Sequence, residues 1–263
     1  RDEAAPSVAK ARNLLVTREF EAAVAAKDAS VYRSFLAEFD SWPEAAPFIP
    51  QARKSECDLA FEAAMASRDA VLLREFRAYY GEWPEAVLLE PQAYDAEAEL
   101  AMKAAEKADD ITSLKFLRQT WTRNDWPARI NDSIAIVLVR FIRTKLESRI
   151  ALSPGQVDLV LREAEGIPTF QERAQDIRKP LIAFARSEKS PGMLFLAARI
   201  FPAPPDGPKL LKAAEDLYWK ELVAADEADG WLRFTKWFPL CKRAPEAEQR
   251  YLWHVEIANR NAF

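Results

Sequence analysis

Residues 20–45 read FEAAVAAKDASVYRSFLAEFDSWPEA, and residues 61–86 read FEAAMASRDAVLLREFRAYYGEWPEA. Fourteen of the 26 paired positions are identical without a gap, at an offset of 41 residues. Self-similarity at a fixed period in this range is the sequence signature of repeat architectures, in which each repeat is one supersecondary unit. The first half of the chain therefore carries an internal repeat.

A third, more diverged copy follows the first two. It is aligned through an aspartate, a phenylalanine and a Trp-Pro pair, the last after three extra residues. The aligned positions are Asp28, Asp69 and Asp109, then Phe35, Phe76 and Phe116, then Trp42-Pro43, Trp83-Pro84 and Trp126-Pro127. We therefore assign three repeat units to residues 1–129 and interpret the three tryptophans as structural.

The second copy predicts a long helix, a short helix and a turn. Proline is accepted in the first turn of a helix, so Pro50 marks where the long helix begins. The Asp69 carboxylate is placed to accept from free N–H groups at the start of the short helix, and Gly81 to close it. The expected apolar stripes are Cys57, Phe61, Ala64 and Met65 on the long helix, and Leu72, Phe76, Tyr79 and Tyr80 on the short helix.

The composition favours helix along the whole chain. There are only six glycines, and most of the 17 prolines stand where helices are expected to begin. Tight hairpins rely on glycine, whereas alanine with glutamate, lysine and arginine favours helix. Because one helix pair cannot bury its apolar face alone, such units stack. We therefore predict an all-α fold, an α-solenoid of antiparallel helix pairs of about 41 residues that diverges in the C-terminal half.

Residues 130–263 are expected to form the diverged helical region. Ser153 opens a capping-box pattern, which marks the start of a helix. Pro180 is expected to kink or split the helical segment 168–187, because proline lacks a backbone N–H. The proline-rich stretch 203–208 is the candidate boundary loop.

The arrangement resembles tetratricopeptide-like arrays of helical hairpins. The period of 41 departs from the 34 residues of tetratricopeptide units, and their Trp-Leu-Gly-Tyr signature is missing. Asp28 and Asp69 are each followed, seven and eleven residues later, by aromatic residues. This spacing also looks like short helical repeats found beside bacterial caspase-like domains. This second resemblance implies an accessory or scaffold role and carries over no active-site residue.

Residue types that build catalytic or metal sites are scarce. His254 is the only histidine, and the two cysteines, Cys57 and Cys241, are 184 residues apart. A structural zinc site needs four such ligands, and a Ser-His-Asp triad would have to use His254. We interpret both cysteines as unpaired thiols, with a disulfide as the alternative if the fold brings them together. Carboxylates are abundant but expected on exposed helix faces, so no catalytic, cofactor or metal residue is singled out.

Four of the eight tryptophans gather near the C-terminal end, at Trp219, Trp231, Trp237 and Trp253. The first interpretation of this group is a C-terminal core. The alternative is an aromatic anchor surface for a partner protein, because tryptophan is enriched at binding hot spots. These four residues are therefore the candidate partner-binding residues.

The charge balance argues against nucleic acid as the principal partner. The formal net charge is −4 and the pI is about 5.4, whereas nucleic-acid binding relies on concentrated positive charge. No apolar run approaches the ~18 residues that a transmembrane helix needs. No small-molecule substrate or cofactor is implied, and the expected partners are other protein subunits.

Together these patterns predict a non-enzymatic scaffold for protein–protein interactions. The specific expectation is an accessory subunit of a larger complex, in mitochondria or another organelle. The start at Arg1 rather than methionine fits either a cleaved targeting segment or a shortened chain. One alternative is a hydrolase that acts through carboxylates on a helical superhelix. The other is an RNA-binding helical repeat, which would need lysines and arginines gathered on one face.

Overall fold

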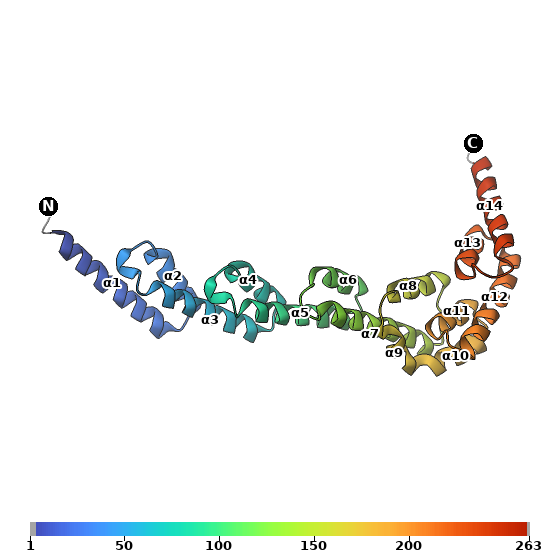
Figure 1. Cartoon of the computed structure of the whole chain (residues 1–263), viewed down its shortest axis with the longest axis horizontal. Helices are drawn as coiled ribbons and strands as arrows, with labels where there is room; N and C mark the ends of the chain where they lie inside the picture. The colour runs from blue at the N-terminus through green and yellow to red at the C-terminus, as the bar shows by residue number, and fades with distance from the viewer. Residues whose placement is uncertain (1–3, 262–263) are drawn as a thin grey trace. The chain divides into compact units, whose positions relative to one another are not determined.

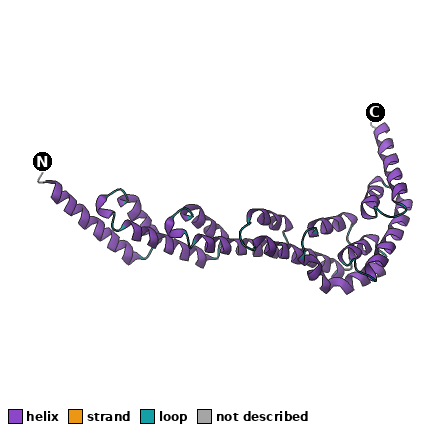
Figure 2. Cartoon of the chain, in the orientation of Figure 1, coloured by secondary structure: helices purple, strands orange, loops and turns teal. Residues whose placement is uncertain are grey.

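A computed structural model describes the backbone of residues 4–261 and the side chains of residues 7–260. All regular structure in these ranges is helical, and they contain no strand (Figure 2). The chain forms two compact units: unit 1 ends at Ala108, and unit 2 begins at Asp109. The all-α prediction is therefore confirmed for the described part of the chain.

Unit 1 alternates long and short helices (Figure 1). Their bounds are α1 Ala4–Ala26, α2 Ala29–Phe39, α3 Ile49–Ser67, α4 Ala70–Tyr80 and α5 Glu90–Lys107, with the 3-10 turns η1 Pro43–Ala45 and η2 Pro84–Ala86. Each short helix, α2 or α4, packs against the long helix before it and the long helix after it. Both 3-10 turns have the sequence Pro-Glu-Ala, because both belong to the Trp-Pro position of the repeat.

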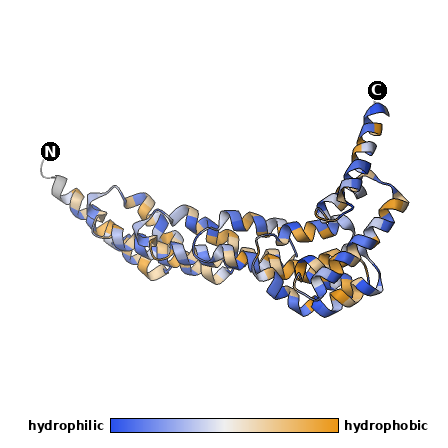
Figure 3. Cartoon of the chain, turned by 45° about the vertical axis from the view of Figure 1, so that its right-hand side comes forward, coloured by the Kyte–Doolittle hydropathy of each residue, from blue (hydrophilic) through white to orange (hydrophobic). Residues whose placement is uncertain are grey.

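Unit 2 is built around α7 and α11. Its helices are α6 Ile111–Thr120, α7 Trp126–Glu147, α8 Pro154–Ala164, α9 Thr169–Arg173, η3 Ala174–Ile177, α10 Arg178–Ser187, α11 Pro191–Ile200, α12 Asp206–Ala225, α13 Ala228–Trp237 and α14 Ala244–Asn261. Helix α11 is buried along almost its whole length and packs against α8, α10 and α12. A helix that is apolar all round belongs in a core, whereas most other helices carry both hydrophobic and hydrophilic residues (Figure 3).

One kind of turn recurs between a long helical segment and the next short helix. In unit 1 a residue with left-handed backbone, Lys27 or Arg68, is followed at once by an aspartate. The side chains of those aspartates, Asp28 and Asp69, accept from the backbone N–H groups of Ser30 and Val71. A left-handed residue commonly ends a helix, and a capping carboxylate satisfies a free donor of the next one. The predicted cap at Asp69 is confirmed.

The same turn continues in unit 2. Left-handed residues stand before α6, α8, α11 and α13, at positions 109, 149, 189 and 226, which are 40, 40 and 37 residues apart. Asn124 and Gly166 also have left-handed backbone but lie outside this spacing. Ser153 caps α8 through a complete capping box, and Ser190 caps α11. The backbone pattern of the turn therefore persists in unit 2, where sequence identity to the repeat copies of unit 1 has been lost.

The third copy of the repeat begins one residue later than the aligned aspartates predict. Asp109 has the left-handed backbone of Lys27 and Arg68, and its neighbour Asp110 is the residue that caps α6, accepting from the Ser113 N–H. A shift of one residue turns a helix by about 100°. For that reason Phe116 is 65 % exposed, and the half-buried Leu117 stands at the position of Phe35 and Phe76.

The predicted stripes of the second copy are also partly wrong. On α3, Cys57 and Ala64 are buried, but Met65 is exposed. On α4, Phe76 and Tyr80 are buried, whereas Leu72 and Tyr79 are exposed. Leu73, rather than Leu72, is the buried leucine of this helix. Gly81 does follow α4, but with right-handed backbone (φ −58°) rather than the left-handed conformation that glycine favours.

Two repeat-related aromatic clusters form the core of unit 1. In the first, the Phe20 ring packs on Phe35 and Phe48, with centroids 5.6 and 4.9 Å apart. In the second, Phe61 packs on Phe76 at 5.5 Å. Phe20 and Phe61 occupy one repeat position, and Phe35 and Phe76 another. The phenylalanines that pack a long helix against the short helix after it are therefore identical in the two copies.

The tryptophans of the repeat pack into the fold. Trp42 meets Phe39 edge to face at 5.2 Å, and Trp83 meets Tyr80 in the same way at 5.0 Å. Both are half-buried, and Trp126 is fully buried. Such aromatic pairs add to the stability that burial itself provides.

The predicted boundaries lie inside folded elements. The division between residues 129 and 130 falls within α7, whereas the compact units divide between α5 and α6. Residues 203–208 are not a boundary between units, because α12 already begins at Asp206 and packs against α11. The segment with Pro180 is split into α9, η3 and α10, and the proline lies in the first turn of α10.

No helix in the described residues is long and apolar enough to cross a membrane. Cys57 is buried, Cys241 is half-buried, and both are unpaired thiols. Burial raises the pKa of Cys57 to about 11, which keeps that thiol protonated at neutral pH.

The cap at Asp69 gives a direct test of this turn. We expect Asp69→Ala to lower the free energy of unfolding by about 1 kcal/mol, because the Val71 N–H loses its acceptor. Asp69→Asn should lie within a few tenths of a kcal/mol of the wild type, since its amide oxygen accepts the same bond. Urea unfolding followed by circular dichroism measures both, and equal losses would contradict the capping role.

Candidate protein-binding groove

Two glutamates on the long helices of unit 1 are buried, contrary to the expectation that carboxylates lie on exposed faces. Glu56 on α3 and Glu97 on α5 are each only 1 % exposed. They stand 41 residues apart and so occupy the same repeat position. A buried carboxylate needs hydrogen-bond donors, and in both cases arginines of the preceding short helix supply them.

Glu56 is held by Arg33 and Tyr80. The Arg33 Nε donates to Glu56 Oε1 at 2.9 Å, and the Tyr80 hydroxyl donates to the same oxygen at 2.8 Å. The Arg33 Nη2 donates to the Tyr80 hydroxyl oxygen at 2.7 Å, which closes the triangle. Burial raises the pKa of Tyr80, so its hydroxyl keeps the proton that it donates.

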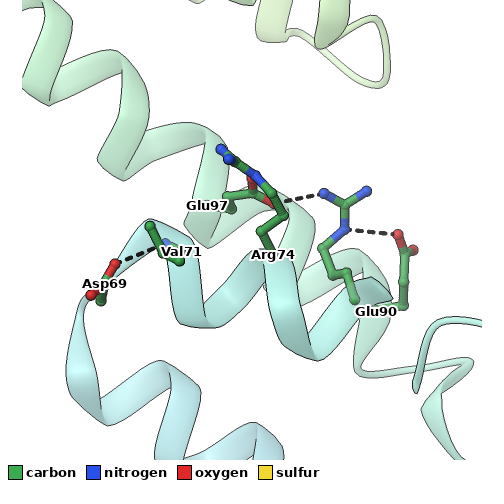
Figure 4. Close-up of polar contacts among 6 residues, drawn as sticks. Asp69, Val71, Arg74, Glu90 and Glu97 are labelled. Carbon is green, nitrogen blue, oxygen red and sulfur yellow. Dashed lines mark hydrogen bonds and ion pairs between the residues drawn. The ribbon is translucent and has the colours of Figure 1, made fainter. Parts of the chain in front are cut away.

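Glu97 is held by two arginines of α4 (Figure 4). The Arg74 Nε donates to Glu97 Oε1 at 2.8 Å, and the Arg77 Nη1 donates to Glu97 Oε2 at 2.7 Å. The Arg77 Nε also donates to Glu90 at 3.1 Å, so that Arg77 bridges the two carboxylates. Arg33 and Arg74 are again 41 residues apart. We call the contact of Arg33 with Glu56 the first clasp, and the contact of Arg74 and Arg77 with Glu97 the second clasp. The contact between a short helix and the next long helix is thus a property of the repeat.

The first clasp fixes Arg33 beside an exposed aromatic ring. The Arg33 guanidinium lies 4.8 Å from the centroid of the Tyr79 ring, on the neighbouring short helix. Tyr79 in turn contacts Trp83, with ring centroids 5.9 Å apart. Although it belongs to the predicted apolar stripe, Tyr79 is 52 % exposed.

Arg33 and Tyr79 line two cavities. The larger, of about 370 Å³, is lined by Arg33, by alanines of α3 and by side chains of α4; its lining residues are Arg33, Ala60, Ala63, Ala64, Leu72, Glu75, Phe76, Tyr79 and Tyr80. The smaller, of about 180 Å³, is lined by Arg33, Leu36, Ala37, Asp40, Arg53, Glu56, Tyr79 and Trp83. We call these two cavities together the Tyr79 groove. Apolar and aromatic walls with a few polar groups are typical of binding pockets.

The repeat explains why sequence reasoning missed this groove. Tyr79 corresponds to Glu38 in the first copy, and Glu75 corresponds to Ser34, so the groove residues are among those that differ between copies. The available signal was an extra aromatic residue beside a repeated one, the Tyr79-Tyr80 pair. Assigning both tyrosines to the buried face concealed it.

The four candidate tryptophans of unit 2 do not share one surface. Trp231 and Trp237 are buried, and Trp219 is half-buried, 5.4 Å from Trp231 in an edge-to-face contact. The Trp237 ring stacks on Phe195 at 4.5 Å. Three of the four therefore belong to the core around α12 and α13, and only Trp253 on α14 is exposed, by 51 %.

His254 joins a structural network at the end of α12. Its Nε2 lies 3.2 Å from Asp226 Oδ1, and the Trp231 Nε1 donates to the same oxygen at 2.9 Å. These contacts, the Trp231 hydrogen bond first, lower the pKa of Asp226. Within the described residues, no group of three His, Cys, Asp or Glu side chains is arranged to hold a metal ion.

Unit 2 also has a groove with apolar walls. A cavity of about 650 Å³ lies between the C-terminal part of α7 and α10, and its apolar lining residues are Leu146, Ile177, Pro180, Ala183 and Phe184. Basic and acidic side chains, among them Arg143 and Asp176, mix at its rim. This cavity presents no single sign of charge to a partner.

The fold and these surfaces define a class: an all-α protein of paired helices with apolar grooves between them. No family model, curated protein or solved structure matches the chain. Its function is therefore inferred from the geometry of the helices and their surfaces.

The two clasps predict unequal responses to the same substitution. Arg33→Ala leaves the buried Glu56 with only the Tyr80 hydroxyl, and we expect a loss of about 2 kcal/mol, moderated because Arg33 is half exposed. Arg74→Ala should cost less, since Arg77 still donates to Glu97. Urea unfolding of both variants measures the difference, and equal losses would contradict the clasp.

Urea unfolding also distinguishes the buried tryptophans of unit 2 from the exposed one. Trp231→Ala should lower the free energy of unfolding by about 3–5 kcal/mol, because it leaves a cavity in the core. Trp253→Ala should change it by no more than about 0.5 kcal/mol, as expected of an exposed position. A large loss of stability from Trp253→Ala would show that this ring, too, belongs to the core.

Proposed function

We propose that this chain is a non-enzymatic α-solenoid, similar to tetratricopeptide-like arrays, that binds other proteins. The regular return of the same turn, from Lys27 to Asp226, supports a succession of antiparallel helix pairs through both units. Repeat proteins of this kind stack their units into extended concave surfaces, which they use for binding. Within this class, an accessory subunit of a larger assembly, in mitochondria or another organelle, is the specific role that we propose.

The observation that carries the proposal is the exposure of large apolar side chains on helices that are otherwise well packed. In the described residues they include Leu14, Val71, Tyr79, Phe116, Val223 and Trp253. Single exposed apolar residues are common, but apolar residues that line a groove indicate an interaction site. The Tyr79 groove meets that condition, with Leu72, Phe76 and Tyr79 on one wall.

The two alternatives have less support. A hydrolase of the kind considered needs a pair of carboxylates free to exchange protons, whereas Glu56 and Glu97 are held as acceptors by arginines. RNA binding needs unpaired basic side chains, whereas Arg33, Arg74 and Arg77 are engaged with carboxylates.

Affinity capture of the tagged chain from its native cells tests the proposal. We expect a stoichiometric complex that survives about 1 M salt, because charge interactions are then screened beyond about 3 Å while apolar contacts persist. Cell fractionation should place the complex in an organelle. A chain that emerges alone at both low and high salt would contradict the role of an accessory subunit.

A further inference from the structure

We propose that the Tyr79 groove binds an extended segment of a partner protein, in which a large apolar residue stands next to a lysine or arginine. This inference rests on the proposed function and specifies its ligand. It follows from the shape of the groove, from its charge and from the comparison between repeat copies.

The shape favours an extended segment. Arg33 and Tyr79 line both cavities, and the guanidinium lies 4.8 Å from the ring centroid, so the cavities adjoin at this pair of side chains, which we call the ridge. An extended chain places every second side chain on the same side, about 7 Å apart. Two such side chains can enter the two cavities while the backbone crosses the ridge.

The ridge is held in place before any ligand binds. Arg33 is fixed by the buried Glu56 and the Tyr80 hydroxyl, and the Tyr79 ring contacts both Tyr80 and Trp83, with centroids 4.7 and 5.9 Å away. Binding therefore orders few side chains, which favours affinity. The Tyr79 hydroxyl, which makes no hydrogen bond within the described residues, can form a hydrogen bond with the backbone of the ligand.

The charge of the groove selects a basic ligand. Arg33 is paired with Glu56, and Arg53 is paired with Asp40 at 3.0 Å. Glu75, at the rim of the larger cavity, makes no hydrogen bond or ion pair within the described residues. The charge left without a partner is thus negative, and it stands beside the cavity that takes the apolar side chain. A lysine or arginine next to that side chain complements it.

The first repeat copy provides matched controls. Its residues at the positions of Tyr79 and Glu75 are Glu38 and Ser34, and both are exposed. The core phenylalanine at the neighbouring repeat position, Phe35 in the first copy and Phe76 in the second, is buried in each. The variants Tyr79→Glu and Glu75→Ser therefore place on α4 residues that the same fold already carries on α2. We expect both to fold with wild-type stability.

Selection from a displayed library of random peptides of about ten residues, roughly 33 Å when extended, tests the inference on the full chain. We expect the selected peptides to share an apolar residue next to lysine or arginine. Tyr79→Glu should weaken their binding about 30-fold, as for a central aromatic contact, and Glu75→Ser about threefold. Glu75→Lys should shift the selected sequences from basic to acidic neighbours.

The control variants Glu38→Tyr and Ser34→Glu should leave binding of these peptides unchanged. Failure to select any peptide, or selection of peptides that bind Tyr79→Glu as well as the wild type, would overturn the inference. So would a preference for acidic neighbours in the wild type. If Tyr79→Glu still captures the native complex in full, the groove is not the binding site, and the broader proposal of a protein-binding scaffold stands.

Discussion

Each long helical segment that precedes a short helix ends in a residue with left-handed backbone, and the short helix begins within a few residues of it. In unit 1 an aspartate follows immediately and caps the new helix. A non-glycine residue in this conformation costs about 1–2 kcal/mol, so packing on both sides must hold it there. Because this turn recurs every 37–41 residues, it sets which side chains of a short helix meet the long helices around it.

The buried glutamates depend on that placement. Glu56 and Glu97 can be buried only because Arg33 and Arg74 arrive at the same position on successive short helices. Removing a charge from water is costly unless its partners are close and well oriented. The clasp therefore couples the register of each short helix to that of the long helix after it. In the first clasp it also fixes the Arg33 guanidinium, which lines both cavities of the Tyr79 groove.

Repetition leaves the exposed positions free to differ. The two copies share the core phenylalanines and the clasp, but Glu38 and Ser34 in one correspond to Tyr79 and Glu75 in the other. The fold tolerates these changes because both positions face solvent. One architecture can thus carry different surfaces on successive units, and the binding properties proposed for α4 need not apply to α2.

The sequence by itself determined the helical class, the period and the caps at Asp69 and Ser153. These depend on local signals: identity at a fixed offset, and a capping side chain before an apolar helix. It did not determine which residues face outward. The predicted stripe of α4 contained Leu72 instead of the buried Leu73, and Tyr79 as well as Tyr80. In the third copy, a one-residue error put the exposed Phe116 at the position of Leu117. Only tertiary packing decided these cases, since adjacent positions on a helix differ by about 100° and the neighbouring helices choose between them. The burial of Glu56 and Glu97 was likewise decided by arginines 23 residues away in the chain.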